Sequence, residues 1–400
     1  MKEESIIKSN VSIVLIGIGG YGDLYVSHLL DSSEASIVGV VDINPQKSKN
    51  YQTIIERQIP VFSSIETFYE NWSADLAIIS TPIHLHADQT CYALTHGSHV
   101  LCEKPMCTTV EDAERMIATR NASNKFLAIG FNWSFQPSIQ ALKHDIQNGL
   151  YGKPKRLKTI ALWPRTGSYF ERAPWAGRKY GNNGELIIDS VASNACAHYL
   201  HHMFYLLGAT TEESAHLQQV TAELYRANPI ENFDTCAVKT IIDEGVEVLY
   251  YATHAVPETF GPHFTFEFEH ATISYTQEEG SNGVVAHFHD GNKKTYKDPR
   301  TEDPLHKLSI CIEAAKSGKQ VIYCGPEAAY AHTLCINSMH HSMPEIIHFP
   351  DTLIQHDQQK DLTWVEGLSE TLMKCFEESR MPSEYQLDWA KEGKVITLSN

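Results

Sequence analysis

The sequence predicts an α/β protein in which a doubly wound parallel sheet is followed by an α+β domain with a large, open, mainly antiparallel sheet. Two observations carry this prediction. Between residues 11 and 130, continuous apolar strands alternate with helix-like stretches, which is typical of a parallel sheet covered on both faces. After residue 150, strand-like runs follow one another with short turns such as 243–245, which is typical of antiparallel strands.

The expected elements follow from these patterns. In the first part the strands are expected at 11–16, 36–42, 75–80, 98–103 and 126–130, and the helices at 20–31, 84–96 and 108–123. In the second part we expect a helix at 189–207, strands near 214–226, 234–242, 246–255, 263–276 and 283–289, and helices near 304–317, 326–341 and 361–377. The predicted domains are residues 1–132, residues 133–350 and a C-terminal extension, 351–400, of unknown role.

Composition excludes several classes of protein. The formal net charge of −17 argues against nucleic acid as a partner, because neutralising phosphates takes clustered Lys and Arg. The longest apolar runs, such as 11–18, are far shorter than the about 18–20 residues that cross a bilayer. The first five residues do not resemble a signal peptide, and the nine cysteines form no C-x-x-C pair. We therefore expect a cytoplasmic protein with reduced thiols that binds neither nucleic acid nor membranes.

A glycine-rich turn follows the first expected strand and opens the first expected helix. Residues 17–22 read Gly-Ile-Gly-Gly-Tyr-Gly, a G-x-G-x-x-G pattern. Its glycines allow the tight turn, the approach of backbone to a pyrophosphate, and close packing of helix on strand. The helix N-terminus adds free N–H donors for phosphate. The expected cofactor contacts in this turn are Gly17, Gly19, Gly20, Tyr21 and Gly22.

A carboxylate ends the second expected strand. Asp42 lies 20 residues beyond Gly22, where a carboxylate accepts hydrogen bonds from the adenosine ribose hydroxyls of a dinucleotide. Because it would repel a 2′-phosphate, Asp42 favours NAD over NADP, although nearby Lys47 leaves NADP possible as a second choice. The sequence therefore predicts a Rossmann-type NAD(P)-binding domain over residues 1–132.

Two further loops follow strand ends, which is where open α/β sheets bind their ligands. One reads Ser80-Thr81-Pro82-Ile83-His84-Leu85-His86, and the other Glu103-Lys104-Pro105-Met106. With the glycine-rich turn, these T-P-x-x-x-H and E-K-P motifs resemble those of the Gfo/Idh/MocA oxidoreductases, which include glucose–fructose oxidoreductase and inositol dehydrogenase. The resemblance covers about residues 11–350.

The resemblance implies a fold and roles for these loops. In the family a dinucleotide-binding domain precedes a domain whose open sheet faces the active site on one side and often a partner subunit on the other. This implies a homodimer or homotetramer built through the second-domain sheet. Lys104 would lie near nicotinamide and substrate, with a Lys104–Pro105 bond that is often cis in relatives. The implied cofactor contacts in the two loops are Thr81, Pro82, His84, His86, Glu103 and Lys104.

The family's second-domain signature is an aspartate followed four residues later by a histidine, on a helix that ends in L-x-G. Counting back from Leu206-Leu207-Gly208 places His198 at the histidine and Asn194 at the aspartate position. The nearest aspartate is Asp189, so either Asn194 or Asp189 fills that position. Oxidation of an alcohol needs a base for its proton, a role that suits a neutral His198, while Lys104 would stabilise negative charge on the same oxygen.

Residues 151–180 reverse the local charge. They contain eight Lys and Arg residues against one acid, Glu171, interleaved with aromatic residues that can stack on sugar rings. A solvated loop is the preferred reading for 153–158. Arg165, Tyr169, Arg172 and Trp175 resemble substrate-side residues of sugar-handling relatives, and the resemblance also implies substrate contacts by Asn132 and His201. No histidine grouping has the spacing of a complete metal site, so we expect no catalytic metal.

The resemblance implies an NAD-dependent dehydrogenase that acts on a secondary hydroxyl of a sugar, cyclitol or sugar derivative. Two alternatives stay open at this point. The protein could use NAD transiently to hydrolyse or epimerise a sugar without net redox change. It could also be a catalytically inactive protein that binds the dinucleotide as a regulatory ligand, which the asparagine at position 194 would favour.

Overall fold

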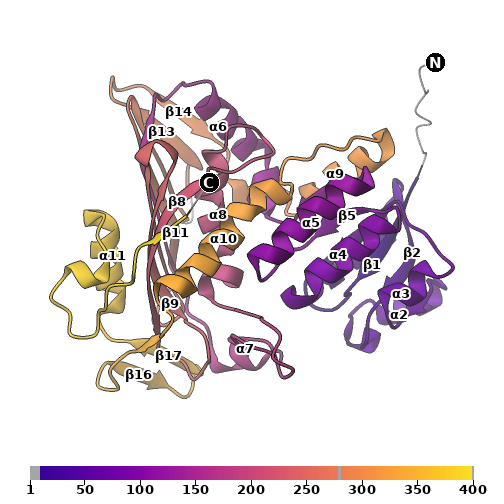
Figure 1. Cartoon of the computed structure of the whole chain (residues 1–400), viewed down its shortest axis with the longest axis horizontal. Helices are drawn as coiled ribbons and strands as arrows, with labels where there is room; N and C mark the ends of the chain where they lie inside the picture. The colour runs from indigo at the N-terminus through magenta and orange to yellow at the C-terminus, as the bar shows by residue number, and fades with distance from the viewer. Residues whose placement is uncertain (1–9, 278–280, 399–400) are drawn as a thin grey trace. The chain divides into compact units, whose positions relative to one another are not determined.

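The computed structural model describes residues 10–277 and 281–398. The chain forms two compact units (Figure 1). The first consists of Met1–Gln136 and Asp303–Tyr330, and the second of Pro137–Glu302 and Ala331–Asn400. The predicted ranges differ from these units in two places. Residues 303–330 join the first unit rather than the second domain, and the C-terminal extension is part of the second unit.

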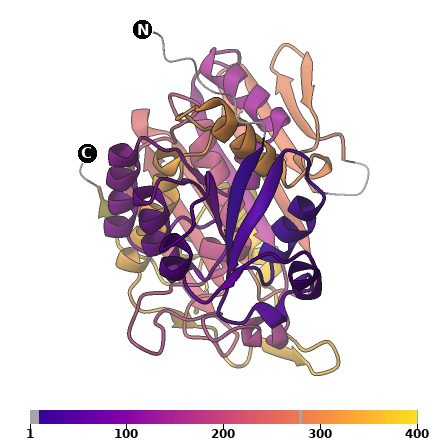
Figure 2. The same ribbon diagram turned by 90° about the vertical axis from the view of Figure 1, so that its right-hand side faces the viewer.

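The first unit contains a six-stranded parallel sheet in the order β3-β2-β1-β4-β5-β6. Its strands are β1 (Val11–Ile16), β2 (Ala35–Val41), β3 (Val61–Phe62), β4 (Leu76–Ile79), β5 (His99–Cys102) and β6 (Leu127–Ile129). Helices flank the indigo strands of this sheet in Figure 2. They are α1 (Gly22–Leu30), α2 (Tyr51–Glu56), α3 (Ile65–Tyr69), α4 (His86–Thr95), α5 (Val110–Ser123) and α9 (His306–Ser317). The predicted doubly wound sheet is confirmed, and the short β3, α2 and α3 are additions to it.

The register of this sheet brings the ends of its strands to one edge. Ile16, the last residue of β1, pairs with Val41 at the end of β2 and with Ile79 at the end of β4. The pairing continues from Ile79 to Cys102 and from Cys102 to Ile129. The residues that follow these strands therefore share one edge of the sheet: Gly17, Asp42, Ser80, Glu103 and Gly130.

A buried ion pair links helix α9 to the rest of the first unit. Lys307 has a fully buried side chain, and its ammonium pairs with the Glu103 carboxylate and donates to Gly130 O at 3.2 Å. Tyr25 of α1 donates to the same carboxylate oxygen. Burial and the nearby Glu103 carboxylate raise the pKa of Tyr25 well above its usual range. A segment just over two hundred residues from β5 is thus held against the end of that strand.

The second unit contains a ten-stranded mixed sheet, mostly antiparallel, as predicted. Its spatial order is β14-β13-β12-β11-β7-β10-β9-β8-β15, with β18 also pairing to β8. The β7–β10 and β8–β15 pairs are parallel. The strands are β7 (Pro154–Leu162), β8 (Leu217–Arg226), β9 (Thr235–Ile242), β10 (Glu247–Thr253), β11 (Phe260–Phe268), β12 (Ala271–Thr276), β13 (Val284–Phe288), β14 (Lys293–Tyr296), β15 (Ile347–His348) and β18 (Ile396–Thr397).

Helices lie on both faces of this sheet, with α8 on one side and α11 on the other (Figure 1). Two adjacent tyrosines of β10 show the two layers. Tyr250 donates to Cys196 O at the start of α8, and Tyr251 donates to Arg380 O, just beyond α11. The helices with residues in this unit are α6 (Pro137–Gln147), α7 (Gly167–Glu171), α8 (Ala197–Leu206), α10 (Pro326–Ser342) and α11 (Leu368–Glu378). A π-helical turn, Val191–Ala195, precedes α8, and a small hairpin pairs β16 (Ile354–Asp357) with β17 (Leu362–Val365).

Several expected elements of the second unit differ from the structure. Residues 154–162, treated as part of a basic loop, form the central strand β7, in which Arg156 pairs with Glu247. The expected helix at 189–207 is shorter and is interrupted at Cys196 between the π-helical turn and α8. The expected strand at 263–276 is a hairpin of β11 and β12, and residues 362–365 form β17 rather than the start of a helix.

None of the helices within 10–277 and 281–398 is both long enough and apolar enough to cross a membrane. The nine cysteines are all unpaired, and only Cys91 is not buried. The predicted placement of most cysteines in the core is therefore what the structure shows.

We predict that Lys307→Met destabilises the protein by about 3–5 kcal/mol, because it leaves the buried Glu103 carboxylate without its cation. Urea unfolding followed by circular dichroism measures the change. The matched control is Lys316→Met on the same helix, whose side chain pairs with the exposed Glu34 and should contribute about 0–1 kcal/mol. If the two variants unfold at the same urea concentration, the buried pair does not stabilise the protein.

Candidate functional site

The glycine-rich turn has the geometry that a phosphate-binding loop needs. Gly17 has φ +81°, and a Cβ on it would lie 2.8 Å from Ser80 O. A Cβ on Gly22 would lie 2.1 Å from Gly17 O, so only glycine lets α1 start this close to β1. By contrast, no atom lies within 4 Å of the Cβ positions of Gly19 or Gly20. The outer side of the turn is therefore open to a ligand, beside the N-terminus of α1.

Asp42 lies at the end of β2, as predicted, and its carboxylate holds the turn. Ile18 N donates to one oxygen at 2.9 Å and Asn44 N donates to the other at 2.7 Å. Since each carboxylate oxygen can accept more than one hydrogen bond, capacity remains for ribose hydroxyls. Tyr21 is 40% exposed, and Asn132 donates to its hydroxyl at 3.4 Å, so these two predicted contacts lie together in the first unit.

The Glu-Lys-Pro loop is held by buried hydrogen bonds and an ion pair of the Glu103 carboxylate. The Glu103 carboxylate accepts from Tyr25 and Lys307 and from Lys104 N at 3.2 Å. It is only 8% exposed, so these partners indicate that it positions the loop. The Lys104–Pro105 bond is cis, as the resemblance implies, and Lys104 itself is half-buried.

His86 joins the two motif loops. Its Nδ1 lies 2.9 Å from Pro105 O and its Nε2 lies 2.8 Å from Thr81 O. The ring is 2% exposed and burial lowers its pKa, so the side chain links the loops rather than presenting a surface to a cofactor. Thr81 is half-buried and donates to Gln89 at 2.6 Å. Pro82 and His84 lie at the half-buried start of the turn before α4.

In the second unit, Asn194 and Asp189 contact each other. Asn194 Nδ2 donates to Asp189 Oδ1 at 2.8 Å, and Gly177 N donates to Asp189 Oδ2 at 2.7 Å. Arg172 lies 3.6 Å from that same oxygen. Asp189 is 6% exposed and surrounded by donors, so it orients Asn194 and is poorly placed to act as a base.

The two predicted histidines of α8 differ in burial. His198 is half-buried in the first turn of the helix. His201 is 1% exposed, stacks on Tyr205, and has a pKa that burial lowers well below its usual range. The structure does not support the expected substrate contact by His201, because its ring faces the core.

The predicted arginine segment forms one cluster around Tyr169. The guanidinium carbons of Arg165 and Arg172 lie 5.0 and 3.8 Å from the centre of the Tyr169 ring. Arg172 also lies over Trp175, at 4.7 Å, and Arg165 over Trp163, at 5.5 Å. Four residues predicted from charge and aromatic spacing are thus neighbours in space.

Sequence reasoning missed three residues that position these groups. Lys307 and Tyr25 hold Glu103, and Asp361 holds the arginine segment. Gly167 N donates to Asp361 O at 2.9 Å and Ser168 N donates to Asp361 Oδ2 at 2.7 Å. The sequence predicts a helix at 304–317 that contains Lys307. Nothing in the sequence indicates that Lys307 pairs with Glu103, about two hundred residues away.

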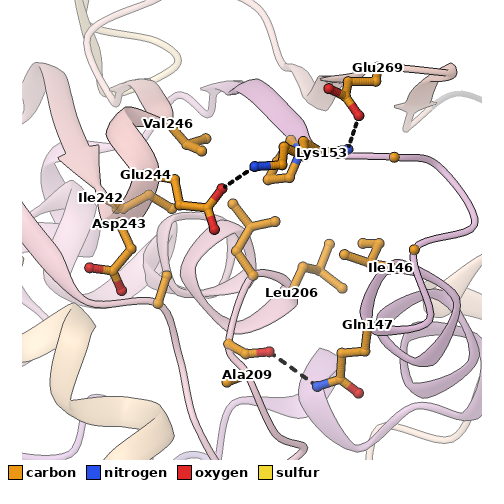
Figure 3. Close-up of a pocket in the computed structure, with 16 residues that line it drawn as sticks. Ile146, Gln147, Lys153, Leu206, Ala209, Ile242, Asp243, Glu244, Val246 and Glu269 are labelled. Atoms are coloured by element: carbon orange, nitrogen blue, oxygen red, sulfur yellow. Dashed lines mark hydrogen bonds and ion pairs between the residues drawn. The ribbon is translucent and has the colours of Figure 1, made fainter.

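A pocket of about 490 Å³ in the second unit lies where α6 and α8 end (Figure 3). Its polar groups are engaged with one another. Lys153 Nζ lies 3.2 Å from Glu244, Lys153 N donates to Glu269, and Gln147 donates to Gly208 O. The pocket contains none of the predicted site residues, so we do not assign the function to it. In the described part of the chain, no group of three or more His, Cys, Asp or Glu could hold a metal ion.

Comparison with known proteins bears on the first unit most directly. Residues 11–131 match the family described as "Oxidoreductase family, NAD-binding Rossmann fold", the Gfo/Idh/MocA oxidoreductases. The N-terminal domain is therefore similar to this family. The predicted resemblance and the prediction of an NAD-binding Rossmann domain are therefore confirmed.

Individual relatives are similar over part of the chain. A 1-carboxy-3-chloro-3,4-dihydroxycyclohexa-1,5-diene dehydrogenase from Comamonas testosteroni is 31% identical over 37% of this chain and 37% of its own length. A myo-inositol 2-dehydrogenase from Thermotoga maritima is 23% identical over 38% of this chain and 45% of its own length. The matches thus span less than half of these curated relatives.

A solved structure extends the likeness to both units. The WlbA dehydrogenase from Chromobacterium violaceum, in complex with NADH and UDP-GlcNAcA, aligns with a TM-score of 0.69 at 20% identity. The alignment covers 85% of this chain and 95% of that one. At this identity the likeness shows a shared fold, and it leaves about a seventh of this chain without a counterpart.

We predict that Asp42→Asn weakens NAD binding by about 10-fold and narrows the preference for NAD over NADP. The variant loses a charge-assisted acceptor for ribose hydroxyls and removes the charge that repels a 2′-phosphate. Isothermal titration with each dinucleotide measures both effects. Asp88→Asn, at an exposed carboxylate that pairs with Arg115 on the surface, is the control. An unchanged ratio of NAD to NADP affinity in Asp42→Asn would remove Asp42 from cofactor selection.

Proposed function

We propose that this protein is an NAD-dependent dehydrogenase that oxidises a secondary hydroxyl of a sugar, cyclitol or sugar derivative. The observation that carries the proposal is the single sheet edge on which the glycine-rich turn, Asp42, the Thr81 loop and the Glu-Lys-Pro loop all follow strand ends. This edge is where open α/β sheets bind dinucleotides. The relatives described above are named as dehydrogenases of hydroxylated rings.

We assign the binding of the dinucleotide to the first unit. Its pyrophosphate would lie against Gly19, Gly20 and the N-terminus of α1, and its adenosine ribose against Asp42. When bound, NAD accepts the hydride that leaves the substrate carbon. His86 and Glu103 act as positioning residues, since their side chains hold the two loops and are themselves buried.

We assign two roles at the reacting hydroxyl, acceptance of its proton and stabilisation of the negative charge that develops on its oxygen, to two side chains. His198 accepts the hydroxyl proton, because a neutral imidazole is a base near neutral pH. Lys104 donates a hydrogen bond to the same oxygen and stabilises the negative charge that grows on it. Asn194, oriented by Asp189, donates to a substrate hydroxyl but cannot take a proton.

Substrate contacts beyond the reacting hydroxyl are assigned to the cluster of Arg165, Tyr169, Arg172 and Trp175. Aromatic faces stack on the C–H surface of a sugar ring, and guanidinium groups donate several hydrogen bonds in one plane. The C-terminal hairpin supports this assignment, since Asp361 holds the backbone of the segment at Gly167 and Ser168.

The test is oxidation of a panel of sugars, uronic acids and cyclitols by the purified protein with NAD, followed by absorbance of the reduced nicotinamide. Formation of NADH with at least one class of substrate is expected. Product without net NADH would favour the hydrolase or epimerase alternative instead. Tight NAD binding without any turnover would favour a regulatory protein.

We predict that Lys104→Ala and His198→Ala each lower kcat by about 10²- to 10⁴-fold while NAD affinity changes less than about 2-fold, because each group acts on the reacting oxygen. Steady-state kinetics and NAD titration measure the two effects. Lys155→Ala and His216→Ala, at exposed side chains, are the matched controls. Normal turnover in either active-site variant would remove that residue from the mechanism.

A further inference from the structure

The arginine cluster of the second unit has more positive charge than its neighbours neutralise. Arg172 lies 3.6 Å from Asp189, which also accepts hydrogen bonds from Gly177 and Asn194. Arg165 donates to Pro164 O at 3.1 Å, and no carboxylate within 10–277 and 281–398 forms an ion pair with it. One guanidinium charge in this cluster is therefore left over.

The surroundings of Arg165 suit the binding of an anion. Its guanidinium lies between the rings of Trp163 and Tyr169, at 5.5 and 5.0 Å from their centres. His254, which lies beside the cluster, cannot add a charge because burial and Arg165 lower its pKa to about 3. A guanidinium has five N–H donors, and the Pro164 carbonyl and the Tyr169 hydroxyl engage only some of them. The remaining donors, on an aromatic platform, suit a planar or tetrahedral anion.

The cluster is joined to the helix that carries His198. Arg172 contacts Asp189, and Asp189 accepts from Asn194, four residues before His198. On the other side, Trp163 packs edge-on against Tyr199, the residue after His198, at 5.5 Å. The Arg165 guanidinium is thus linked to His198, the proposed base, through Trp163 and Tyr199.

We propose that the substrate is an acidic sugar derivative whose carboxylate or phosphate binds Arg165, with Tyr169 and Trp163 packing against its ring. This inference rests on the proposed dehydrogenase function and names the class of its substrate. Hydroxyl oxidation then takes place on a ring whose orientation is set by its anionic group.

The experiment compares acidic sugars with their neutral parents. D-glucuronate, D-galacturonate and glucose 6-phosphate are titrated into the protein with NADH, against D-glucose and D-galactose, and each is assayed for oxidation with NAD. At least one acidic sugar should bind at least 10-fold more tightly than its parent. The preference for a uronate or for the phosphate distinguishes the two anions.

The variants separate the anion site from general packing. Arg165→Gln should weaken binding of the acidic sugar by about 10- to 100-fold and binding of the neutral parent by a much smaller factor, because the neutral sugar loses only a hydrogen bond, while Arg165→Lys restores part of the loss. Lys155→Gln, on an exposed side chain of β7, is the control. Equal binding of acidic and neutral sugars, or an equal loss of both in Arg165→Gln, would overturn the proposal. Failure of the dehydrogenase function is a separate result, seen as binding without NADH formation.

A second inference comes from the C-terminal residues 351–398, which cover one face of the large sheet. Leu368, Leu372 and Phe376 of α11 pack in a buried cluster with side chains of β7, β8, β9 and β10. Lys158, 7% exposed on β7, donates to Phe376 O at 2.8 Å and to Glu377 O at 3.1 Å, at the end of α11. On β8, the buried carboxylate of Glu223 accepts from Ser383 N at 3.1 Å.

The rest of that face is polar. Strand β12 alternates buried Ile273 and Tyr275 with half-buried Thr272, Ser274 and Thr276, and its neighbour β11 alternates in the same way. The apolar half of the outer face is thus already packed in the same chain, and the polar half offers little surface for a stable subunit interface.

We infer that residues 351–398 occupy the sheet face on which the resemblance places a partner subunit, so that no second copy of the chain docks there. Sedimentation velocity of the full chain, whose single-copy mass is 45.0 kDa, shows whether a dimer forms, and a monomer at all concentrations supports the inference. If a dimer appears, Ser274→Arg, in the polar half, tests its interface. A dimer that persists in this variant uses another face and supports the inference, while one that dissociates overturns it.

Discussion

The buried carboxylate of Glu103 is the constraint on which the first unit depends. A carboxylate at 8% exposure needs a cation and several donors, and the chain supplies Lys307 from α9, Tyr25 from α1 and a backbone N–H from its own loop. Gly130, at the end of β6, leaves room for it, since a Cβ there would lie 2.8 Å from a Glu103 oxygen. The position of the neighbouring Lys104 therefore depends on three other segments, which are α1, α9 and the end of β6.

A different constraint applies to the second unit, because both apolar faces of its open sheet must be packed against other elements. The adjacent Tyr250 and Tyr251 point to opposite faces, and each hydroxyl donates to backbone of a different layer. On one side α8 carries the proposed base. On the other side α11 and the residues around it form the cover, and the hairpin of β16 and β17 extends from this cover to hold the arginine segment through Asp361. One C-terminal stretch thus supports both the sheet and the proposed substrate site.

Much of the first unit could be predicted because its signals are local. A strand that is buried on both faces reads as a continuous apolar run, and the glycine-rich turn, Asp42 and the Glu-Lys-Pro loop each follow such a run directly. The second unit was harder to predict. The basic residues of β7 made a central strand look like a solvated loop. In the structure, Arg156 pairs with Glu247 and Lys158 donates to carbonyls of α11. The continuous apolar run in β10 does indicate a strand that is buried on both faces. Interpreting this region only as antiparallel strands did not use that indication.

The sequence by itself determined the resemblance of the first unit to an NAD-binding oxidoreductase family and supplied most of the residues that we propose to act, because motif residues adjoin the strand ends that position them. Only the tertiary structure decided which of those side chains are available. It buried His86, Glu103 and His201, joined Asn194 to Asp189, and grouped Arg165 with Arg172 around one tyrosine. It also brought Lys307 and Asp361 to segments about two hundred residues away. Such contacts depend on how distant elements pack, and spacing along the chain does not encode that packing.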